Sequence, residues 1–362
     1  EDGNMHKTPL YVLITGLLIL NFFGAITEQP LHATTGITIF VDDSSYPKRD
    51  GTAEYPFRTI QDALDIAEAK DTIYVFAGVY DEPLIINKEV TLVGSIEGGP
   101  SIIETLKDER YTIQITKDLV TFESFTVRDT GHHKTSPIGA LICIKASDVV
   151  VQSNYINDTD SWGIYLDPTS SGCVISGNDI NNTKKGIYID NSDTHDIFNN
   201  IITNSTDDGI YLTQCSNTRL YDNDISTSGQ GINVQYSTAT NITNNHIFEN
   251  IYSGIGLYGG KNTIIRNNLF EKNDGNGIYL QTANTEIIDN TFESNRRGIN
   301  LDQSDCIIKN NIFANNTASG IFTTQFSQDN LITLNKFNDN TKSAQDAGTN
   351  TWYEEQQGNY WS

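Results

Sequence analysis

The chain has 362 residues, with 23 Lys or Arg against 46 Asp or Glu, which gives a formal net charge of −23. A chain this acidic repels a phosphate backbone, so nucleic acid is excluded as an expected partner. The acidity would suit a saline medium, calcium, or solubility through self-repulsion. An acidic polysaccharide would need a local basic groove or bridging cations.

Residues 1–33 are predicted to be a signal peptide. Met5 is a plausible start, a basic segment follows it, residues 9–26 are apolar, and Ala33 ends a segment that suits cleavage. A single membrane anchor is the alternative, because the apolar run approaches the length that spans a bilayer. In either case residues 34–362 are expected outside the membrane, secreted or at the cell surface.

Residues 34–71 are predicted to form an N-terminal strand and cap, with the strand at residues 38–42. Residues 60–70 favour an amphipathic helix with Thr59 as its N-cap. The apolar residues on one face of this helix are Ile60, Ala63, Leu64, Ile66 and Ala67. A stacked repeat must cover its open end, and this helix is the expected cover.

Residues 72–148 contain short alternating runs that predict irregular coils, with a longer excursion near residues 129–137. Residues 149–340 then repeat one motif nine times. Each copy has an Asn with an aliphatic residue three positions earlier and a large apolar residue two positions later. In the first eight copies, a Gly stands eight or nine positions after the Asn. The asparagines are spaced 21–24 residues apart: Asn154, Asn178, Asn200, Asn223, Asn245, Asn268, Asn290, Asn311 and Asn335.

A fixed period of this length is typical of a stacked repeat. The runs are too short for helices, and alternation places Ile164 and Leu166 on one face and Tyr165 on the other. Stacked at roughly 4.8 Å per turn, the aliphatic columns would fill the interior and the asparagines would form a hydrogen-bonded ladder. Asn and Gly would also supply the left-handed backbone that sharp corners need. The pattern predicts an all-β, right-handed, single-stranded parallel β-helix of about 12 coils, roughly 55–60 Å long.

In residues 341–362 the repeat decays. Trp352, Tyr353, Tyr360 and Trp361 are expected to plug the C-terminal end. Residues 34–362 are therefore predicted to form one β-helix domain.

The N-x-I/F and G-I-Y-L rhythm, as in residues 163–166 and 277–280, resembles the parallel β-helix repeat of pectate lyase-like proteins. Within that group the chain looks most like the NosD-like surface proteins of archaea. Its final residues 358–362 (GNYWS) are similar to a segment often found at the end of their β-helices. The resemblance runs from about residue 37 to the end. It implies the fold but no single activity, because the superfamily hosts lyases, hydrolases, epimerases, esterases, adhesins and envelope proteins.

The resemblance to pectate lyases implies a calcium ion held by clustered carboxylates, and a Lys or Arg that removes a proton from the substrate. The best acidic cluster comprises Asp158, Asp160, Asp167, Asp190, Asp207 and Asp208. Asp167 and Asp190 lie one coil apart and should be neighbours, with Lys184 and Lys185 between them. If the chain is an enzyme, these four are the predicted catalytic residues. The competing interpretation is a solvated corner of an acidic solenoid, with no cofactor.

His132 and His133 in the excursion are candidate copper or zinc ligands, and NosD proteins are associated with copper delivery to a reductase. Two adjacent histidines without a third ligand at fixed spacing are weak evidence for a site. The chain has a single Met, which excludes a Met-rich copper site.

Four tyrosines recur at the same place in their coils and are expected to face outward: Tyr165, Tyr188, Tyr211 and Tyr279. Such rings are candidates to stack on sugars. The alternative is that outward aromatic residues simply favour strands.

The four cysteines do not suggest a disulfide framework. Cys173 and Cys306 occupy one column but lie six coils apart, roughly 29 Å at the strand spacing and beyond disulfide reach. Cys143 is expected in the core, and Cys215 at an exposed corner, where it is the candidate for an intermolecular disulfide. Five sequons are compatible with a glycosylated surface protein, at Asn157, Asn181, Asn204, Asn241 and Asn315.

Two functional hypotheses follow. The first is a structural or adhesive cell-envelope protein of surface-layer or sheath type, self-associating into a lattice or binding other surface proteins. The regular coils, the lack of a recognisable catalytic constellation and the unpaired strand edges at both ends favour it. The second is a polysaccharide-active lyase or hydrolase, or a carbohydrate-binding surface protein, with calcium as the cofactor implied for a lyase.

Overall fold

The computed structural model describes residues 36–44, 48–105, 110–129, 139–355 and 357–362. Residues 35–362 form one compact unit. The predicted signal peptide and the His132–His133 pair lie outside the described residues. No helix in the described ranges is long and apolar enough to cross a membrane.

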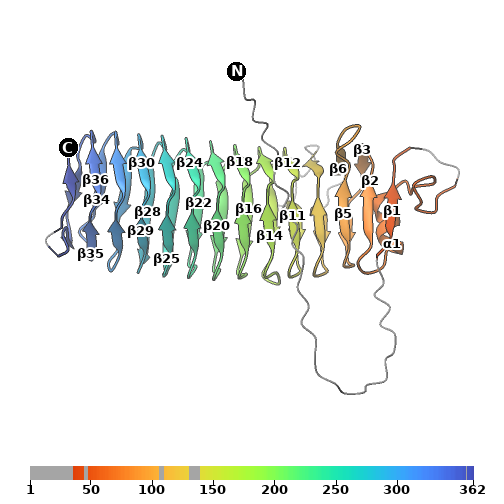
Figure 1. The fold of residues 1–362 in the computed structure, drawn as a ribbon, viewed down its shortest axis with the longest axis horizontal. Helices are drawn as coiled ribbons and strands as arrows, with labels where there is room; N and C mark the ends of the chain where they lie inside the picture. Colours follow the sequence, from red (N-terminus) through yellow and green to blue (C-terminus); the bar gives the residue numbers. More distant parts are fainter. Residues whose placement is uncertain (1–35, 45–47, 106–109, 130–138, 356) are drawn as a thin grey trace, which may run out of the picture. The chain divides into compact units, whose positions relative to one another are not determined.

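Three parallel sheets, named A, B and C, build this unit, and the chain visits them in that order once per coil (Figure 1). Within a sheet each strand pairs in parallel with the strand of the coil before and the coil after. The predicted all-β parallel β-helix of about 12 coils is therefore confirmed, and the described residues form 14, 13 and 12 strands in sheets A, B and C.

Most strands contain only three to six residues. Sheet A contains β1 Thr38–Val41, β2 Thr72–Val75, β5 Thr91–Gly94, β8 Thr121–Glu123, β11 Val150–Gln152, β14 Val174–Ser176, β17 Asp196–Phe198, β20 Arg219–Tyr221, β23 Asn241–Thr243, β26 Ile264–Arg266, β29 Glu286–Ile288, β32 Ile307–Lys309, β35 Gln328–Thr333 and β38 Thr349–Thr351. Sheet B contains β3 Gly78–Asp81, β6 Ser101–Thr105, β9 Phe125–Asp129, β12 Tyr155–Asn157, β15 Asp179–Asn181, β18 Ile201–Thr203, β21 Asp224–Ser226, β24 His246–Phe248, β27 Leu269–Glu271, β30 Thr291–Glu293, β33 Ile312–Ala314, β36 Lys336–Asn338 and β39 Tyr360–Trp361. Sheet C contains β4 Leu84–Ile86, β7 Tyr111–Ile115, β10 Ala140–Ile144, β13 Trp162–Leu166, β16 Lys185–Asp190, β19 Asp208–Thr213, β22 Gln230–Gln235, β25 Ile255–Lys261, β28 Asn276–Ala283, β31 Arg297–Leu301, β34 Ser319–Thr323 and β37 Ala344–Asp346.

The interior is made of columns of identical or similar apolar residues. Ile164 pairs with Ile187 and then Ile210 along sheet C, and all three are fully buried. In sheet B an isoleucine column gives way to four stacked phenylalanines, Phe270, Phe292, Phe313 and Phe337, with ring centroids 4.8, 4.8 and 4.9 Å apart. These distances equal the strand spacing, so each ring packs on its copy without a gap.

The predicted asparagine ladder is confirmed and extends one rung further, to Asn359 of the GNYWS segment. At Asn200 the side-chain amide donates to Asn223 Oδ1 (3.0 Å) and to the carbonyl oxygen of Ile175 in the preceding coil (2.9 Å). The backbone N–H of Asn200 donates to the same Asn223 oxygen (3.1 Å). Every rung thus satisfies buried backbone and side-chain groups together.

A second ladder, absent from the predictions, runs five residues after the first. Its amide rungs are Asn250, Asn273, Asn295, Asn316 and Asn340. In earlier coils Thr183, Ser205 and Ser228 hold the same position, and the hydroxyls of Thr183 and Ser205 lie 3.1 Å apart.

The left-handed corners predicted for Asn and Gly are present, but they lie one residue before the ladder asparagines. The ladder asparagines do not have positive φ; the residue before each does, as at Ser153 (φ 57°) and Asn199 (φ 54°). The repeated glycines are required by close packing instead. A Cβ at Gly209 would lie 2.6 Å from the carbonyl oxygen of Gly231 in the next coil, and Gly209 has no positive φ.

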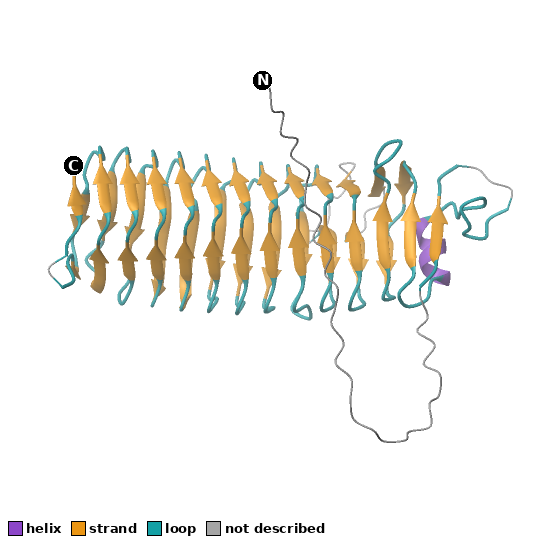
Figure 2. Cartoon of the chain, viewed as in Figure 1, coloured by secondary structure: helices purple, strands orange, loops and turns teal. Residues whose placement is uncertain are grey.

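Helix α1 (Ile60–Ile66) lies beside the first coil (Figure 2) and packs on β1, β2 and β4. Thr59 is its N-cap as predicted, accepting from the backbone N–H of Asp62 (3.2 Å). The helix is shorter than the predicted residues 60–70. Ile66, predicted on its buried face, is 54% exposed, which corrects that prediction.

At the C-terminal end, Trp361 continues the phenylalanine column, with its ring 4.6 Å from that of Phe337. Trp352 packs partly buried against the core. Tyr353 and Tyr360 are exposed, so the prediction that they plug the end is wrong.

Candidate functional site

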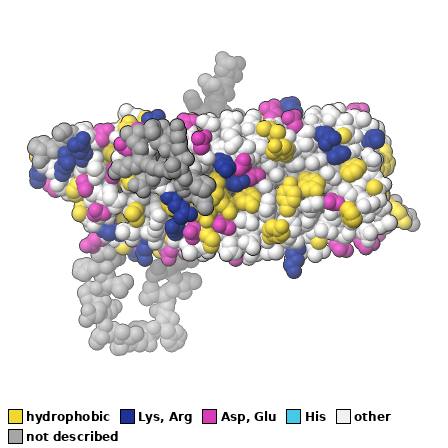
Figure 3. All heavy atoms as spheres, turned by 180° about the vertical axis from the view of Figure 1, so that it is seen from behind, with side chains coloured by type: hydrophobic (Ala, Val, Ile, Leu, Met, Phe, Trp, Pro, Cys, Tyr) yellow, Lys and Arg dark blue, Asp and Glu magenta, His cyan; other side chains and the backbone are white. Residues whose placement is uncertain are grey.

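The outer face of sheet C carries a row of aromatic rings, which we call the aromatic strip: Trp162, Tyr165, Tyr188 and Tyr211. The three tyrosines pair directly in register on β13, β16 and β19, with ring centroids 5.2 and 5.0 Å apart. Trp162 packs against Tyr165 and Tyr188 at 4.9 and 4.6 Å. On the face drawn in Figure 3, hydrophobic side chains gather near the middle, with basic and acidic side chains beside them.

The rings of the strip partly cover one another. Tyr165 faces outward as predicted, but it is only 7% exposed, so it offers no free ring face to a sugar. Tyr188 and Tyr211 are half-buried, and sugar stacking on them stays a prediction. Tyr279 is separate, because Asn233 and Gly256 interrupt the column between it and Tyr211.

One side of the strip is acidic. The Tyr165 hydroxyl donates to Asp190 Oδ2 (3.1 Å). Burial and the nearby Asp190 carboxylate raise the pKa of Tyr165 and of Tyr188 far above the ordinary value. Both phenols therefore stay protonated at any physiological pH and act as hydrogen-bond donors.

The other side carries a lysine held between carboxylates. Lys185 Nζ contacts the Asp208 carboxylate, lies 3.7 Å from Asp207 Oδ2, and sits 4.4 Å from the centroid of the Tyr211 ring. Asn233 Nδ2 donates to Asp208 Oδ1 (3.0 Å). Side-chain exposure is 16% for Lys185 and 8% for Asp208, so the pair is largely shielded from water.

The six predicted calcium ligands do not form one cluster, which corrects that prediction. Asp158 and Asp160 are exposed at the turn after β12, and Asp158 accepts from Asn182 (2.8 Å). Asp207 and Asp208 already have the ammonium of Lys185 as their cation. Within the described ranges, no three His, Cys, Asp or Glu side chains lie close enough to hold a metal ion.

Asp167 and Asp190 do follow paired residues, Leu166 and Ile189. Lys185 is not between them, however. It begins β16 while Asp190 ends it, which is roughly 16 Å at the rise of a strand. Lys184 is exposed at the preceding turn. The predicted catalytic set of two aspartates and two lysines is therefore not assembled.

A hollow of about 510 Å³, which we call the basic hollow, lies at the N-terminal end of sheet C. It is lined by Gln61, Pro83, Leu84, Ile85, Arg110, Tyr111, Gln114 and Lys145. The Arg110 guanidinium and the Lys145 ammonium lie 5.2 and 5.3 Å from the Tyr111 ring centroid. Two cations thus share one ring in a chain whose net charge is −23.

Cys143 lies between the basic hollow and the strip. It pairs with Gln114 on one side and Tyr165 on the other, so it belongs to the outer face, where Tyr111 and Tyr165 pack over it. It is fully buried, as predicted, in a small second core cluster on this outer face. Burial raises the pKa of its thiol to about 12, so the thiol is unreactive at neutral pH.

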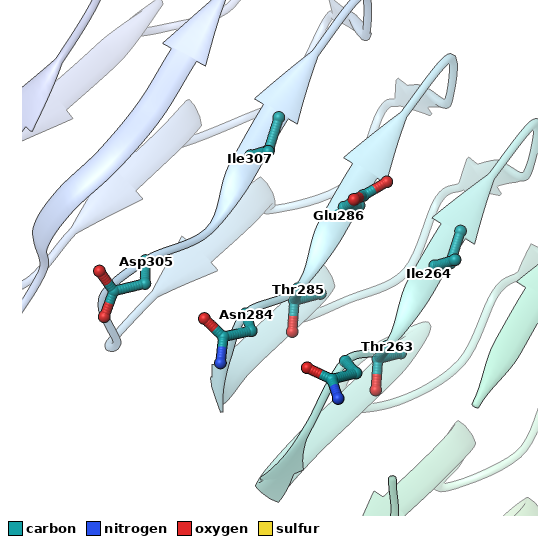
Figure 4. Close-up of a pocket in the computed structure, with 8 residues that line it drawn as sticks. Thr263, Ile264, Asn284, Thr285, Glu286, Asp305 and Ile307 are labelled. Atoms are coloured by element: carbon teal, nitrogen blue, oxygen red, sulfur yellow. The ribbon is translucent and has the colours of Figure 1, made fainter. Parts of the chain in front are cut away.

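A second hollow of about 400 Å³ lies where the chain enters sheet A, across β26, β29 and β32 (Figure 4). Asn284 and Asp305 stand at the corner, with Glu286 on the strand beside them. It contains no aromatic ring and no cation among its lining residues, so it suits an extended glycan or an anion less well than sheet C.

Cys215 is 1% exposed, which contradicts its predicted place at an exposed corner. Its N–H donates to Ser237 Oγ (3.0 Å) and its sulfur lies 3.4 Å from the carbonyl oxygen of Ile189. The predicted intermolecular disulfide would therefore require the coil to open.

His195 was missed by the sequence analysis. It is fully buried, its Nδ1 accepts from the N–H of Cys173 (3.2 Å), and its Nε2 lies 2.8 Å from Ser192 Oγ. Burial lowers the pKa of His195 to about 4, so the ring is neutral at physiological pH. Its hydrogen bond from Cys173 links two neighbouring coils.

Comparison with solved structures shows the same fold at low identity. The Dettilon tailspike protein has a TM-score of 0.68 and 16% identity, covering 86% of this chain and 68% of that chain. The A-module of an Azotobacter vinelandii mannuronan C-5 epimerase has a TM-score of 0.60 and 14% identity, covering 84% and 94%. A complex of XylC with xylose has a TM-score of 0.63 and 12% identity, covering 87% and 86%. A search of curated proteins returned no match.

The family profile described as periplasmic copper-binding protein (NosD) matches residues 225–362. This segment contains one His, one Cys and no Met. His246 lies 3.5 Å from Asp224 and 3.6 Å from Glu271, but no three His, Cys, Asp or Glu side chains among the described residues are placed to hold a metal ion, and Cys306 is buried. The residues of the matched segment therefore do not fit a copper site.

A second profile, the right handed beta helix region, matches residues 97–225 and 139–292. Together these matches cover more than half of the chain, and they agree with the repeat, the register and the solved neighbours. The chain belongs to the right-handed β-helix family, with a NosD-type region in its C-terminal part.

Proposed function

We propose that this chain binds carbohydrate along the outer face of sheet C, at the aromatic strip. The observation that carries the proposal is the register of Tyr188 and Tyr211, which lie in one row beside the buried Tyr165 with hydrogen-bonding carboxylates on both sides. Sugars present apolar C–H faces and hydroxyls together. Half-buried aromatic rings with polar tips suit both.

The spacing also favours an extended chain of sugars. Coils repeat at about 4.8 Å, which is close to the length of one pyranose in an extended glycan. A glycan laid along the axis of the solenoid would therefore meet equivalent rings on successive coils. Asp190 would accept from sugar hydroxyls on one side, and Asn233 would bond on the other.

Binding is better supported than cleavage. A glycosidase needs two carboxyl groups about 5–9.5 Å apart on either side of the bond it cleaves. Asp190 and Asp208, the carboxylates on the two sides of the strip, stand at opposite ends of paired strands, so a glycan on the strip would not lie between such a pair. The solved neighbours whose titles name a carbohydrate reaction or a sugar support a role on carbohydrate without choosing between binding and catalysis. The NosD description and the predicted signal peptide support an extracytoplasmic location.

The test is titration calorimetry of residues 34–362 with a panel of neutral and acidic oligosaccharides. The double variant Tyr188→Ala, Tyr211→Ala should lose about tenfold or more in affinity. Tyr221→Ala is the matched control, because Tyr221 is also an outward, half-buried ring but lies on sheet A. Equal losses in both variants, or no binding to any glycan, would count against the proposal.

The second candidate function is a rigid structural or adhesive element of the cell envelope. The two asparagine ladders and the aromatic column, which run without a break over many coils, favour a stiff rod. Electron microscopy of residues 34–362 would test self-assembly: ordered sheets or tubes would support it, and dispersed short rods under every condition would refute it.

A further inference from the structure

Lys185 and Asp208 form an ion pair that is shielded from water and joins two neighbouring coils. The two residues pair in register at the start of β16 and β19, and Lys185 Nζ contacts Asp208 Oδ2. In the Arg219–Asp196 pair on sheet A, by contrast, the arginine is 61% exposed. The Tyr211 ring, with its centroid 4.4 Å from Nζ, covers the ammonium on one side. The amine nitrogen is therefore held against the carboxyl group.

Two further polar side chains are directed at this pair. Asp207 Oδ2 lies 3.7 Å from Lys185 Nζ, and Asp207 is half-buried, so it can exchange protons with solvent. Asn233 Nδ2, from the next coil, donates to Asp208 Oδ1 (3.0 Å), the other oxygen of the carboxyl group. A nucleophile, a carboxyl carbon, a proton carrier and a hydrogen-bond donor thus meet in one place.

We propose that Lys185 and Asp208 become joined by an isopeptide bond between their side chains, which forms without an added enzyme once the coils have stacked. Asp207 carries the protons, and Asn233 stabilises the oxygen on which negative charge develops. The bond is independent of carbohydrate binding, because no ligand takes part in its formation.

The reaction needs no co-reactant, and its atoms balance. Lys185 passes a proton to Asp207, and the free amine attacks Cγ of Asp208. The N–C bond forms while the N–H of Asn233 stabilises the charge on Asp208 Oδ1. The C–Oδ2 bond then breaks, and Oδ2 leaves as water with the two protons that the nitrogen has given up. No group is oxidised or reduced.

The surroundings favour the bond over a lasting ion pair. Two charges shielded from water have lost part of their hydration, and forming a neutral amide removes that cost. The fixed contact between Lys185 and Asp208 also replaces a chance encounter of the two groups. The product would tie β16 to β19 beside the aromatic strip. All four cysteines are free, so no disulfide holds these coils together.

Mass spectrometry of residues 34–362 after denaturation tests the proposal, because an isopeptide bond survives unfolding. We expect the wild-type chain to be lighter than its sequence mass by one water, and a proteolytic fragment to join Lys185 to Asp208. Lys185→Ala should have its full sequence mass. Lys184→Ala, the exposed neighbouring lysine, is the matched control and should keep the loss. Asp207→Asn should slow bond formation by about a hundredfold, so that most of the freshly purified variant has its full mass.

One other reaction gives the same change in mass. Asp208 precedes Gly209, and an aspartyl succinimide formed at such a sequence also releases one water. Lys185→Ala distinguishes the two, because a succinimide needs no lysine. A wild-type chain that keeps its full sequence mass after prolonged incubation, or a loss of water that persists in Lys185→Ala, would overturn the proposal.

Discussion

Replacing Asn268 by Ala tests how much one ladder rung contributes to stability. Asn268 is 2% exposed. Its Oδ1 accepts from the backbone N–H of Asn245 (2.8 Å) and from the Asn245 side-chain amide (3.0 Å). Its own Nδ2 donates to Asn290 Oδ1 (3.0 Å) and to the carbonyl oxygens of Ile242 (2.9 Å) and Arg266 (3.1 Å).

The expected loss follows from those five hydrogen bonds. Each contributes about 0.5–1.5 kcal/mol net, and a buried donor left without an acceptor costs about 1–3 kcal/mol. The backbone N–H of Asn245 becomes such a donor, since Asn268 Oδ1 is its acceptor. We expect Asn268→Ala to lower the free energy of unfolding by about 3–5 kcal/mol.

Asn267→Gly is the control. Asn267 is the neighbouring residue, but it is exposed and has φ 56°, a conformation that Gly adopts freely. Its effect should stay within about 1 kcal/mol. The assay is equilibrium urea unfolding followed by circular dichroism. If the free energy of unfolding of Asn268→Ala lies within about 1 kcal/mol of the wild-type value, or if both variants lose the same amount of stability, the ladder does not stabilise the coils as argued.

Three further predictions follow. Because the pKa of His195 falls to about 4 on folding from an ordinary 6.5, the unfolded chain binds more protons below pH 6.5, so stability should fall by about 3 kcal/mol between pH 6.5 and 4. Urea unfolding at pH 7, 5 and 4 checks this. If the His195→Gln variant loses as much stability between pH 7 and 4 as the wild type, the result would contradict the prediction. Gly277→Ala should cost about 2 kcal/mol or more, because its Cβ would lie 2.5 Å from Phe292 Cδ1, whereas Gly358→Ala meets nothing closer than 3.8 Å and should be neutral in the same assay. Cys215 should resist a maleimide in the native state and react on unfolding; rapid native labelling, read by mass spectrometry, would refute its burial.

The fold was predictable because each interior position repeats once per coil. The aliphatic column, the asparagine ladder and the glycines each have a fixed offset, and the register follows from the period alone. The second ladder had the same signal, five residues after the first. It was missed because Thr183, Ser205 and Ser228 occupy that position in the earlier coils, so the column is not uniform in residue type.

Some contacts of the site could be predicted from the length of the repeat. Lys185 and Asp208 are one period apart and meet at the start of paired strands. The acidic residues were grouped instead by their nearness in the sequence, although they stand at opposite ends of the strands. Cys143 could not be assigned to a face, since every residue of β10 is buried and the alternation that separates inside from outside is lost.

The central claim is that carbohydrate lies on the outer face of sheet C, and side-chain footprinting by hydroxyl radicals tests it most directly. With the tightest-binding oligosaccharide of the panel present, oxidation of Tyr188 and Tyr211 should fall, while Tyr221 on sheet A and the exposed Tyr236 should oxidise as in the free chain. Protection of Tyr221 with none at Tyr188 and Tyr211, or oxidation unchanged at all four, would contradict the account.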